Sequence, residues 1–226
     1  MRRAFAPIGR AEAHAWTALV LTALGGAVDG AGFLSLSQQF VANQTGNAVL
    51  LAVAVSGEIT GRSDELSPVG PLLSLFGFAL GAVLSSLATR RHILTSFGVP
   101  FLLVVEVVML AAAGLAVTFE LAVALAAFAM GAQSIHAARI GLAGVTTTVL
   151  TGTLIALSVN LSGDRKDLRS ARLQAGVWAV YLVAAGLGSV MAHAVSFSAV
   201  CWAAAAVAAA MAVAAFAEAH RRPATD

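Results

Sequence analysis

The sequence predicts an all-α fold, a polytopic bundle of membrane helices that forms one integral membrane domain over residues 1–226. Of these residues 59% are hydrophobic and only 11% are charged, whereas a soluble domain carries about 25% charged residues. The apolar runs are continuous and do not alternate with polar residues, which excludes the strands of an outer-membrane barrel. Several runs reach the ~20 residues that a helix needs to cross a bilayer.

Six apolar runs have the length of a membrane-crossing helix. They cover residues 16–36, 71–89, 99–118, 121–138, 173–193 and 198–217. Two further runs, 48–57 and 153–161, have only about half that length. Each of the two short runs follows a polar segment that contains a Thr-Gly pair. Each is therefore either a short crossing or a half-helix that returns to the side from which it entered.

The polar segment Phe40–Asn47 separates the first long run from the first short run. Within it, Thr45, Gly46 and Asn47 are residues that commonly begin a helix. Thr and Asn oxygens accept hydrogen bonds from the free N–H groups of a first turn, and glycine allows the backbone to turn. We therefore expect the chain to break here and a new helix to begin.

A similar polar segment with a Thr-Gly pair recurs in the second half of the chain, within Thr146–Thr153. Its Thr-Gly pair lies 106 positions after the first pair, and Gly25 and Gly131 share that offset. Two copies of an uncommon feature at one offset predict an internal duplication. The predicted repeats cover about 14–118 and 121–217.

Two topologies fit these runs. If both short runs are re-entrant, the chain crosses six times, and 12 of its 13 Lys and Arg residues lie inside. Three crossings per repeat then give the two repeats opposite orientations. If both short runs cross, there are eight crossings in a 4+4 repeat, with 10 of the 13 basic residues inside. Basic residues gather on the cytoplasmic side, so the charge count favours six crossings, a 3+3 inverted repeat and two cytoplasmic termini.

Two acidic residues, Asp29 and Glu106, fall inside predicted crossings. A carboxylate in the hydrocarbon layer costs at least ~2.5 kcal/mol on insertion scales, so such residues usually face a cavity or a partner. Both residues are therefore candidates for proton or ion coupling. The alternative for each is a structural hydrogen bond to a neighbouring helix.

A solute site is predicted near the midplane, between the two Thr-Gly elements. Helix N-termini carry partial positive charge, and irregular backbone at membrane depth is tolerated only where it lines a cavity or is buried in protein. The predicted solute-binding residues are Asp29, Asn43, Thr45, Gly46, Asn47, Gln133, Thr148, Thr151, Gly152 and Thr153. The alternative is that these residues only cap kinked helices.

Four segments carry a family resemblance: Gly26–Phe33, Phe40–Asn47, Met130–Gln133 and Thr148–Thr153. In these segments the chain resembles the YoaK-type family of bacterial integral membrane proteins of unknown function. The resemblance extends from about residue 15 to 215. It implies a multi-pass protein of the bacterial inner membrane and supplies neither a substrate nor a mechanism.

The leading functional hypothesis is a transporter or channel-like permease for an unidentified small solute. Inverted repeats with broken helices that meet at the midplane are a recurring plan of transporters. The alternatives are a membrane enzyme acting on a lipid-linked substrate, with Asp29 or Glu106 as general base, and a non-catalytic partner or sensor subunit.

The sequence has no Walker-type loop, zinc signature or Gly-x-Ser-x-Gly elbow. We expect no metal, no cofactor and no nucleic-acid partner; the expected partners are the lipid bilayer and the solute, and a homo-oligomer remains compatible with the sequence.

Overall fold

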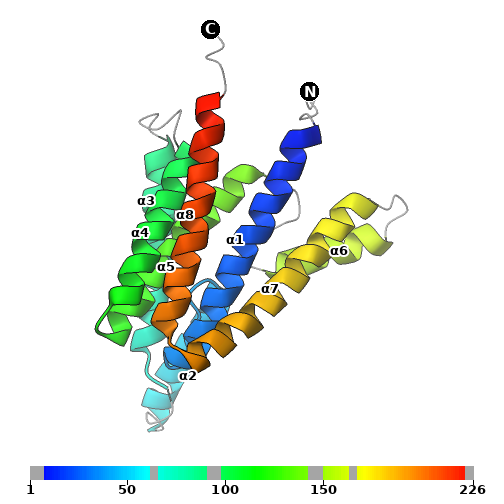
Figure 1. Cartoon of the computed structure of the whole chain (residues 1–226). Helices are drawn as coiled ribbons and strands as arrows, with labels where there is room; N and C mark the ends of the chain where they lie inside the picture. Colours follow the sequence, from blue (N-terminus) through cyan, green and yellow to red (C-terminus); the bar gives the residue numbers. More distant parts are fainter. Residues whose placement is uncertain (1–7, 62–65, 91–97, 142–149, 163–166, 222–226) are drawn as a thin grey trace.

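The structure, a computed structural model, consists of helices joined by short connections. It describes residues 8–61, 66–90, 98–141, 150–162 and 167–221. Within these ranges the helices are α1 (Ile8–Ser35), α2 (Gln44–Thr60), α3 (Val69–Arg90), α4 (Gly98–Leu115), α5 (Phe119–Ile140), α6 (Leu150–Ser162), α7 (Leu168–Ala194) and α8 (Phe197–Arg221) (Figure 1). The described residues contain no strand, which confirms the all-α class.

Five helices of the described chain, α1, α3, α5, α7 and α8, contain an apolar stretch long enough to cross a membrane. All five coincide with predicted runs. Helix α4 has 18 residues, which at 1.5 Å per residue is about 27 Å and close to the ~30 Å of a hydrocarbon core. Length and composition therefore describe a polytopic helical membrane protein.

The two short helices differ in length from the predicted short runs. Helix α2 has 17 residues rather than about ten, because it begins inside the polar segment, with Asn43 as its N-cap, and continues to Thr60. Gly61, in the left-handed conformation at φ 76°, ends it. Helix α6 has 13 residues. It begins at Leu150, so the second Thr-Gly pair lies in its first turn.

Helices α1 and α7 form one of the closest crossings in the bundle. A Cβ atom at Gly26 would lie 2.7 Å from the carbonyl oxygen of Tyr181, and one at Gly30 would overlap the carbonyl of Ala185. Only glycine lets two backbones approach this closely. The contact advances by four residues on both helices, so α1 and α7 run parallel.

Helices α3 and α5 form a second crossing of the same kind. A Cβ atom at Gly77 would lie 2.5 Å from the carbonyl oxygen of Ala124, and one at Gly81 would overlap the carbonyl of Phe128. Here too the contact advances by four residues on both helices. Helices α3 and α5 therefore also run parallel.

Helix α8 packs along α4. The Ser198 hydroxyl, in the first turn of α8, donates a hydrogen bond to the carbonyl oxygen of Gly114, in the last turn of α4. The end of α4 thus lies beside the beginning of α8. The first turn of α1 and the last turn of α8 both lie at the opposite end of the bundle (Figure 1).

Helices α2 and α6 lie at the margin of the bundle. Helix α2 packs mainly on α3, and α6 mainly on α7. Asn47 and Ala54 are the buried residues of α2, and Thr153 is the buried residue of α6. The remaining surface of both short helices is largely apolar and open to the surrounding medium.

Candidate functional site

The chain turns back on itself directly after α1. Ser37 and Gln38 have φ values of 50° and 65°, a left-handed conformation that is uncommon for residues other than glycine. The following residues return alongside α1. The peptide groups of Val41 to Asn43 thereby come level with Asp29, six residues before the end of α1.

Asp29 is buried and accepts hydrogen bonds from this returning backbone. Its Oδ1 atom accepts from the N–H groups of Val41 at 2.8 Å, Ala42 at 2.7 Å and Asn43 at 3.4 Å. Its Oδ2 atom accepts from the Tyr181 hydroxyl of α7 at 2.7 Å. Both carboxylate oxygens are thus engaged inside the protein, which leaves Asp29 poorly placed to act as a general base.

Tyr181 was not among the predicted site residues. A signal was present, because this residue is the only tyrosine of the chain and lies within a long apolar run. A buried tyrosine hydroxyl usually finds a hydrogen-bond partner, so Tyr181 could have been expected to bond another polar group within the bundle.

Asn47 holds the start of the returning segment. Its side-chain oxygen accepts from the N–H of Phe40 at 3.0 Å, and its Nδ2 atom lies 2.6 Å from the carbonyl oxygen of Phe40. The same Nδ2 atom lies 2.8 Å from Ser74 Oγ on α3 and 3.0 Å from Gln44 Oε1. Asn47 therefore ties the backbone of the segment to the first turn of α2 and to α3.

Gln44 and Ser74 complete this arrangement. Gln44 Nε2 donates to the carbonyl oxygen of Val41 at 2.9 Å, and Ser74 Oγ donates to that of Phe40 at 2.7 Å. We call the polar segment 40–47, together with Asp29, Ser74 and Tyr181, the Asp29 hub. The hub links α1, α2, α3 and α7 through buried or half-buried hydrogen bonds.

The hub has the donor groups of an anion site, and a carboxyl group of the protein already fills it. Peptide N–H groups before a helix N-terminus favour negative charge, because they are free donors at the positive end of the helix dipole. Here the carboxylate of Asp29 occupies the donors of residues 41–43. An external carboxylate or carbonyl oxygen reaches these donors only after Asp29 has left them.

The other predicted solute-binding residues are distributed more widely. Asn43 accepts from the N–H of Gly46 as the N-cap of α2, and both belong to the hub. A Cβ atom at Gly46 would lie 2.7 Å from the Phe40 ring, whereas one at Gly152 would meet no described atom within 4 Å. Thr45 lies within the segment, but its side chain is exposed.

In the second half, Thr151 and Gly152 are exposed at the start of α6, and Thr153 is buried. Thr148 lies outside the described residues. Gln133 is buried at the approach of α5 to α1, where its Nε2 atom donates to the carbonyl oxygen of Leu21 at 2.9 Å. The predicted residues therefore fall in three places: the hub, the start of α6 and the contact between α5 and α1.

Glu106 lies apart from the hub, on α4. Its side chain is completely buried. In the described part of the chain, neither of its carboxyl oxygens has a hydrogen-bond partner. The two intramembrane acids that the sequence singled out thus have opposite surroundings.

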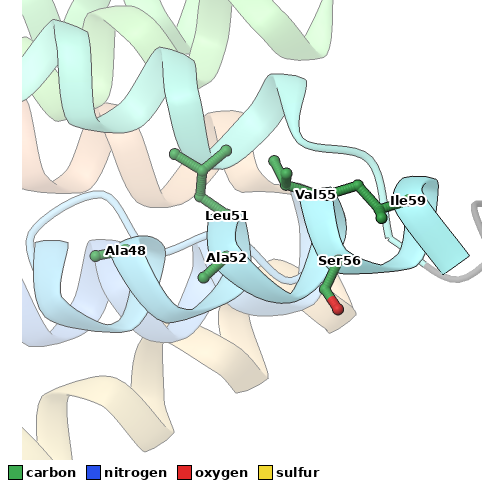
Figure 2. A pocket seen from close by; sticks show the side chains of 6 residues that line it. All are labelled: Ala48, Leu51, Ala52, Val55, Ser56 and Ile59. Atoms are coloured by element: carbon green, nitrogen blue, oxygen red, sulfur yellow. The ribbon is translucent and has the colours of Figure 1, made fainter.

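Two hollows lie on the outer surface of the helices. The first, of about 470 Å³, lies along α2 and is lined by Ala48, Leu51, Ala52, Val55, Ser56 and Ile59, whose side chains Figure 2 shows. The second, of about 330 Å³, lies between α1 and α7 and is lined by Ala23, Ala179, Val180, Val183, Ala184 and Leu187. Neither lining includes a predicted solute-binding residue, and both are mainly apolar, as surfaces toward lipid are.

Comparison with known proteins supports the membrane location. The chain is 35% identical to the UPF0700 transmembrane protein YoaK of Bacillus subtilis (strain 168) over 153 residues, which cover 64% of this chain and 65% of that protein. No solved structure matches the chain. A family model described as "Protein of unknown function (DUF1275)" matches residues 17–214. The predicted resemblance is therefore confirmed, and the chain belongs to this family of membrane proteins.

Proposed function

We propose that this protein is an inner-membrane transporter for a small solute, built from two inverted halves, α1–α4 and α5–α8. In this proposal six helices cross, α2 and α6 are re-entrant, and both termini are cytoplasmic. The observation that carries it is the arrangement of helix contacts. Two contacts support a count of how often the chain crosses the membrane.

The first contact is that of Ser198 with Gly114, between the start of α8 and the end of α4. Two points on one side of a membrane are joined by an even number of crossings. Between them the chain passes through α5, α6 and α7, and α5 and α7 are both long enough to cross. Helix α6 therefore returns to the side from which it entered.

The second contact is the parallel crossing of α1 and α7. Parallel crossing helices begin on the same side, so an even number of crossings separates their first residues. Helices α1, α3, α4 and α5 supply four, and α6 supplies none. Helix α2 must then also return, which agrees with the backbone that doubles back to Asp29.

The contacts also support an internal duplication. In such a duplication α1 corresponds to α5, α2 to α6, α3 to α7 and α4 to α8. When each helix is replaced by its counterpart, the α1/α7 pair becomes the α5/α3 pair and the α2/α3 pair becomes the α6/α7 pair. The α4/α8 pair remains the same pair. All of these are among the packed pairs of the bundle, as a two-fold relation between the halves requires.

Individual glycine contacts follow the same exchange. Gly188 faces the carbonyl of Ala27, and Gly81 faces the carbonyl of Phe128. Ala27 and Phe128 are 101 positions apart, and Gly81 and Gly188 are 107 positions apart.

A second pair of contacts has the same two offsets. Gly30 faces the carbonyl of Ala185, and Gly131 faces the carbonyl of Phe78. On this pairing the counterpart of Gly131 is Gly30, whereas the sequence offset of 106 pairs it with Gly25. The α1/α7 and α3/α5 crossings are thus related contact by contact.

This arrangement suits alternating access. The two glycine crossings are close contacts between the halves, and each half can rock as a unit against the other at these crossings. The bond between Asp29 and Tyr181 also spans the halves and must rearrange when α7 moves against α1. Once Asp29 withdraws, the N–H groups of residues 41–43 are free for the solute. We therefore propose a solute that carries a carboxylate or carbonyl oxygen.

The topology is tested by thiol labelling in a Cys201→Ala background. Thr60→Cys and Val117→Cys should react with an impermeant maleimide in intact cells, and Asp167→Cys only after permeabilisation. The eight-crossing alternative places Thr60 and Val117 inside and keeps Asp167 inside. Labelling of the first two only after permeabilisation would overturn the six-crossing proposal.

The transport proposal is tested by thermal shift on the purified full chain. A panel of amino acids and small dicarboxylates is compared with sugars and alcohols of similar size. At least one carboxylate should raise the Tm of wild type and of Thr60→Ala, whose exposed side chain lies at the far end of α2. If no carboxylate raises the Tm, the proposed solute class is wrong.

A further inference from the structure

Glu106 is a buried acid that neither the hub nor the proposed solute site uses. It lies near the middle of α4 and has no exposed surface. In the described chain its two oxygens are the only pair of carboxyl oxygens that are buried without a hydrogen-bond partner. Asp29, by contrast, accepts four hydrogen bonds.

The surroundings of Glu106 are apolar. On α4 the buried residues at helical spacing around it are Leu102, Leu103, Leu110 and Ala113. Helices α5 and α8, which pack on α4, contribute mainly alanine to the same core cluster. No described backbone or side-chain donor reaches the carboxyl group.

The helices packed against α4 bring no counter-charge to this depth. Residues 69–89 of α3 contain no ionisable side chain, and Glu106 is the only one in α4. The ionisable residues of α5 and α8 lie toward their ends: Glu120, His136, Arg139, Cys201, Glu218, His220 and Arg221. Cys201 packs beside Gly114, eight residues from Glu106, which is about 12 Å along the helix axis.

An ionised carboxylate needs a partner or water in such a place, and burial without either strongly favours the neutral acid. We propose that Glu106 is a proton-binding site in the seam between α4, α5 and α8, occupied by its proton in the packed bundle. The seam joins α4 of one half to α8 of the other. Separation of α4 from α8 would admit water to the carboxyl group and release the proton.

The site predicts a characteristic chemical reactivity. Hydrophobic carbodiimides partition into membranes and react with protonated carboxyl groups. The acid proton moves to a carbodiimide nitrogen, and the carboxyl oxygen bonds to the central carbon. An acyl shift from oxygen to nitrogen then gives a stable N-acylurea that contains the whole reagent, so no group leaves. Dicyclohexylcarbodiimide should therefore modify Glu106.

The experiment treats the full chain in lipid vesicles with dicyclohexylcarbodiimide at pH 7 and locates the adduct by peptide mass spectrometry. The expected result is an adduct on Glu106, loss of that adduct in Glu106→Gln, and little modification of the hydrogen-bonded Asp29. A water-soluble carbodiimide should leave Glu106 unmodified. An unmodified Glu106 in vesicles, together with modification after unfolding in detergent, would overturn the proposal.

A second measurement separates a neutral acid from a charged one. Glutamine has the shape of protonated glutamate and no charge, so Glu106→Gln should keep the wild-type Tm within about 2 °C. A large loss of Tm in Glu106→Gln would mean that the native group is ionised and paired, and would refute the proposal. The proton site does not depend on the transport function, because both readouts are independent of any solute.

Discussion

Substitution of Asn47 by alanine tests whether the Asp29 hub holds the fold together. Asn47 is completely buried. Its amide group lies within hydrogen-bond distance of Phe40, Gln44 and Ser74. An amide has two hydrogens, so it satisfies two of these three acceptors at one time, while its oxygen accepts from the N–H of Phe40.

The expected loss follows from these bonds. Alanine leaves the N–H of Phe40 without its partner, which costs about 1–3 kcal/mol for a buried group. Two donated bonds add about 1 kcal/mol each. The carbonyl of Phe40 keeps its bond from Ser74, and Phe40 is only half-buried, so the total is reduced. We expect Asn47→Ala to lower the free energy of unfolding by about 2–4 kcal/mol.

The measurement is reversible unfolding of the purified protein by sodium dodecyl sulfate in mixed micelles, followed by circular dichroism. Thr45→Ala is the matched control, because Thr45 lies in the same helical turn and is exposed. It should change stability by less than about 0.5 kcal/mol. If Asn47→Ala and the control were equally stable, the hub would not hold the segment, and the structural reasoning would be wrong.

Two further predictions concern α7. Gly188→Ala should destabilise the protein by about 1–3 kcal/mol, because its Cβ would overlap the Ala27 carbonyl. Gly186→Ala should stabilise it by about 0.5–1 kcal/mol, because a Cβ there meets no described atom within 4 Å. Equal effects of the two variants on unfolding by sodium dodecyl sulfate would contradict the close crossing of α1 and α7. Hydrogen bonds from Ser170 hold the pKa of Asp167, the N-cap of α7, below its usual range. Stability from such a group is present above its unfolded pKa and lost as the pH falls through the folded pKa, so Asp167→Ala should lower the Tm at pH 7 and have less effect near pH 3. An effect that does not change with pH would show that the carboxylate charge is irrelevant to the cap.

The helical class and the long helices were predictable because they depend on local composition. A run of about 20 apolar residues has few alternatives to a membrane helix. The start of a helix within residues 40–47 was predicted, but the residue at which α2 begins was not. Asn43 caps the helix within this segment, so residues that the sequence analysis grouped as one polar cluster divide between a returning backbone and a first helical turn.

The partners within the hub could not be predicted from the sequence. Asp29 and Tyr181 are 152 positions apart, and their contact depends on the register of the α1/α7 crossing. That register follows from which glycine faces which carbonyl, as at Gly30 and Ala185. Glycine is frequent here, with 21 residues, so its positions alone allow several registers, and only three-dimensional packing selects one.

The two buried acids show what packing adds to sequence. In the sequence, Asp29 and Glu106 look alike, each a single carboxyl group in an apolar run. They differ in the supply of free backbone N–H groups around them. The segment after α1 returns and donates its free N–H groups to Asp29. Helix α4 lies among unbroken helices, whose N–H groups are already bonded within each helix. A carboxyl group with four donors is held in place in the packed bundle and leaves it only when the donors gain another acceptor. One without donors keeps or loses a proton according to whether water can reach it, so of the two acids Glu106 is the one suited to report movement of the helices around it.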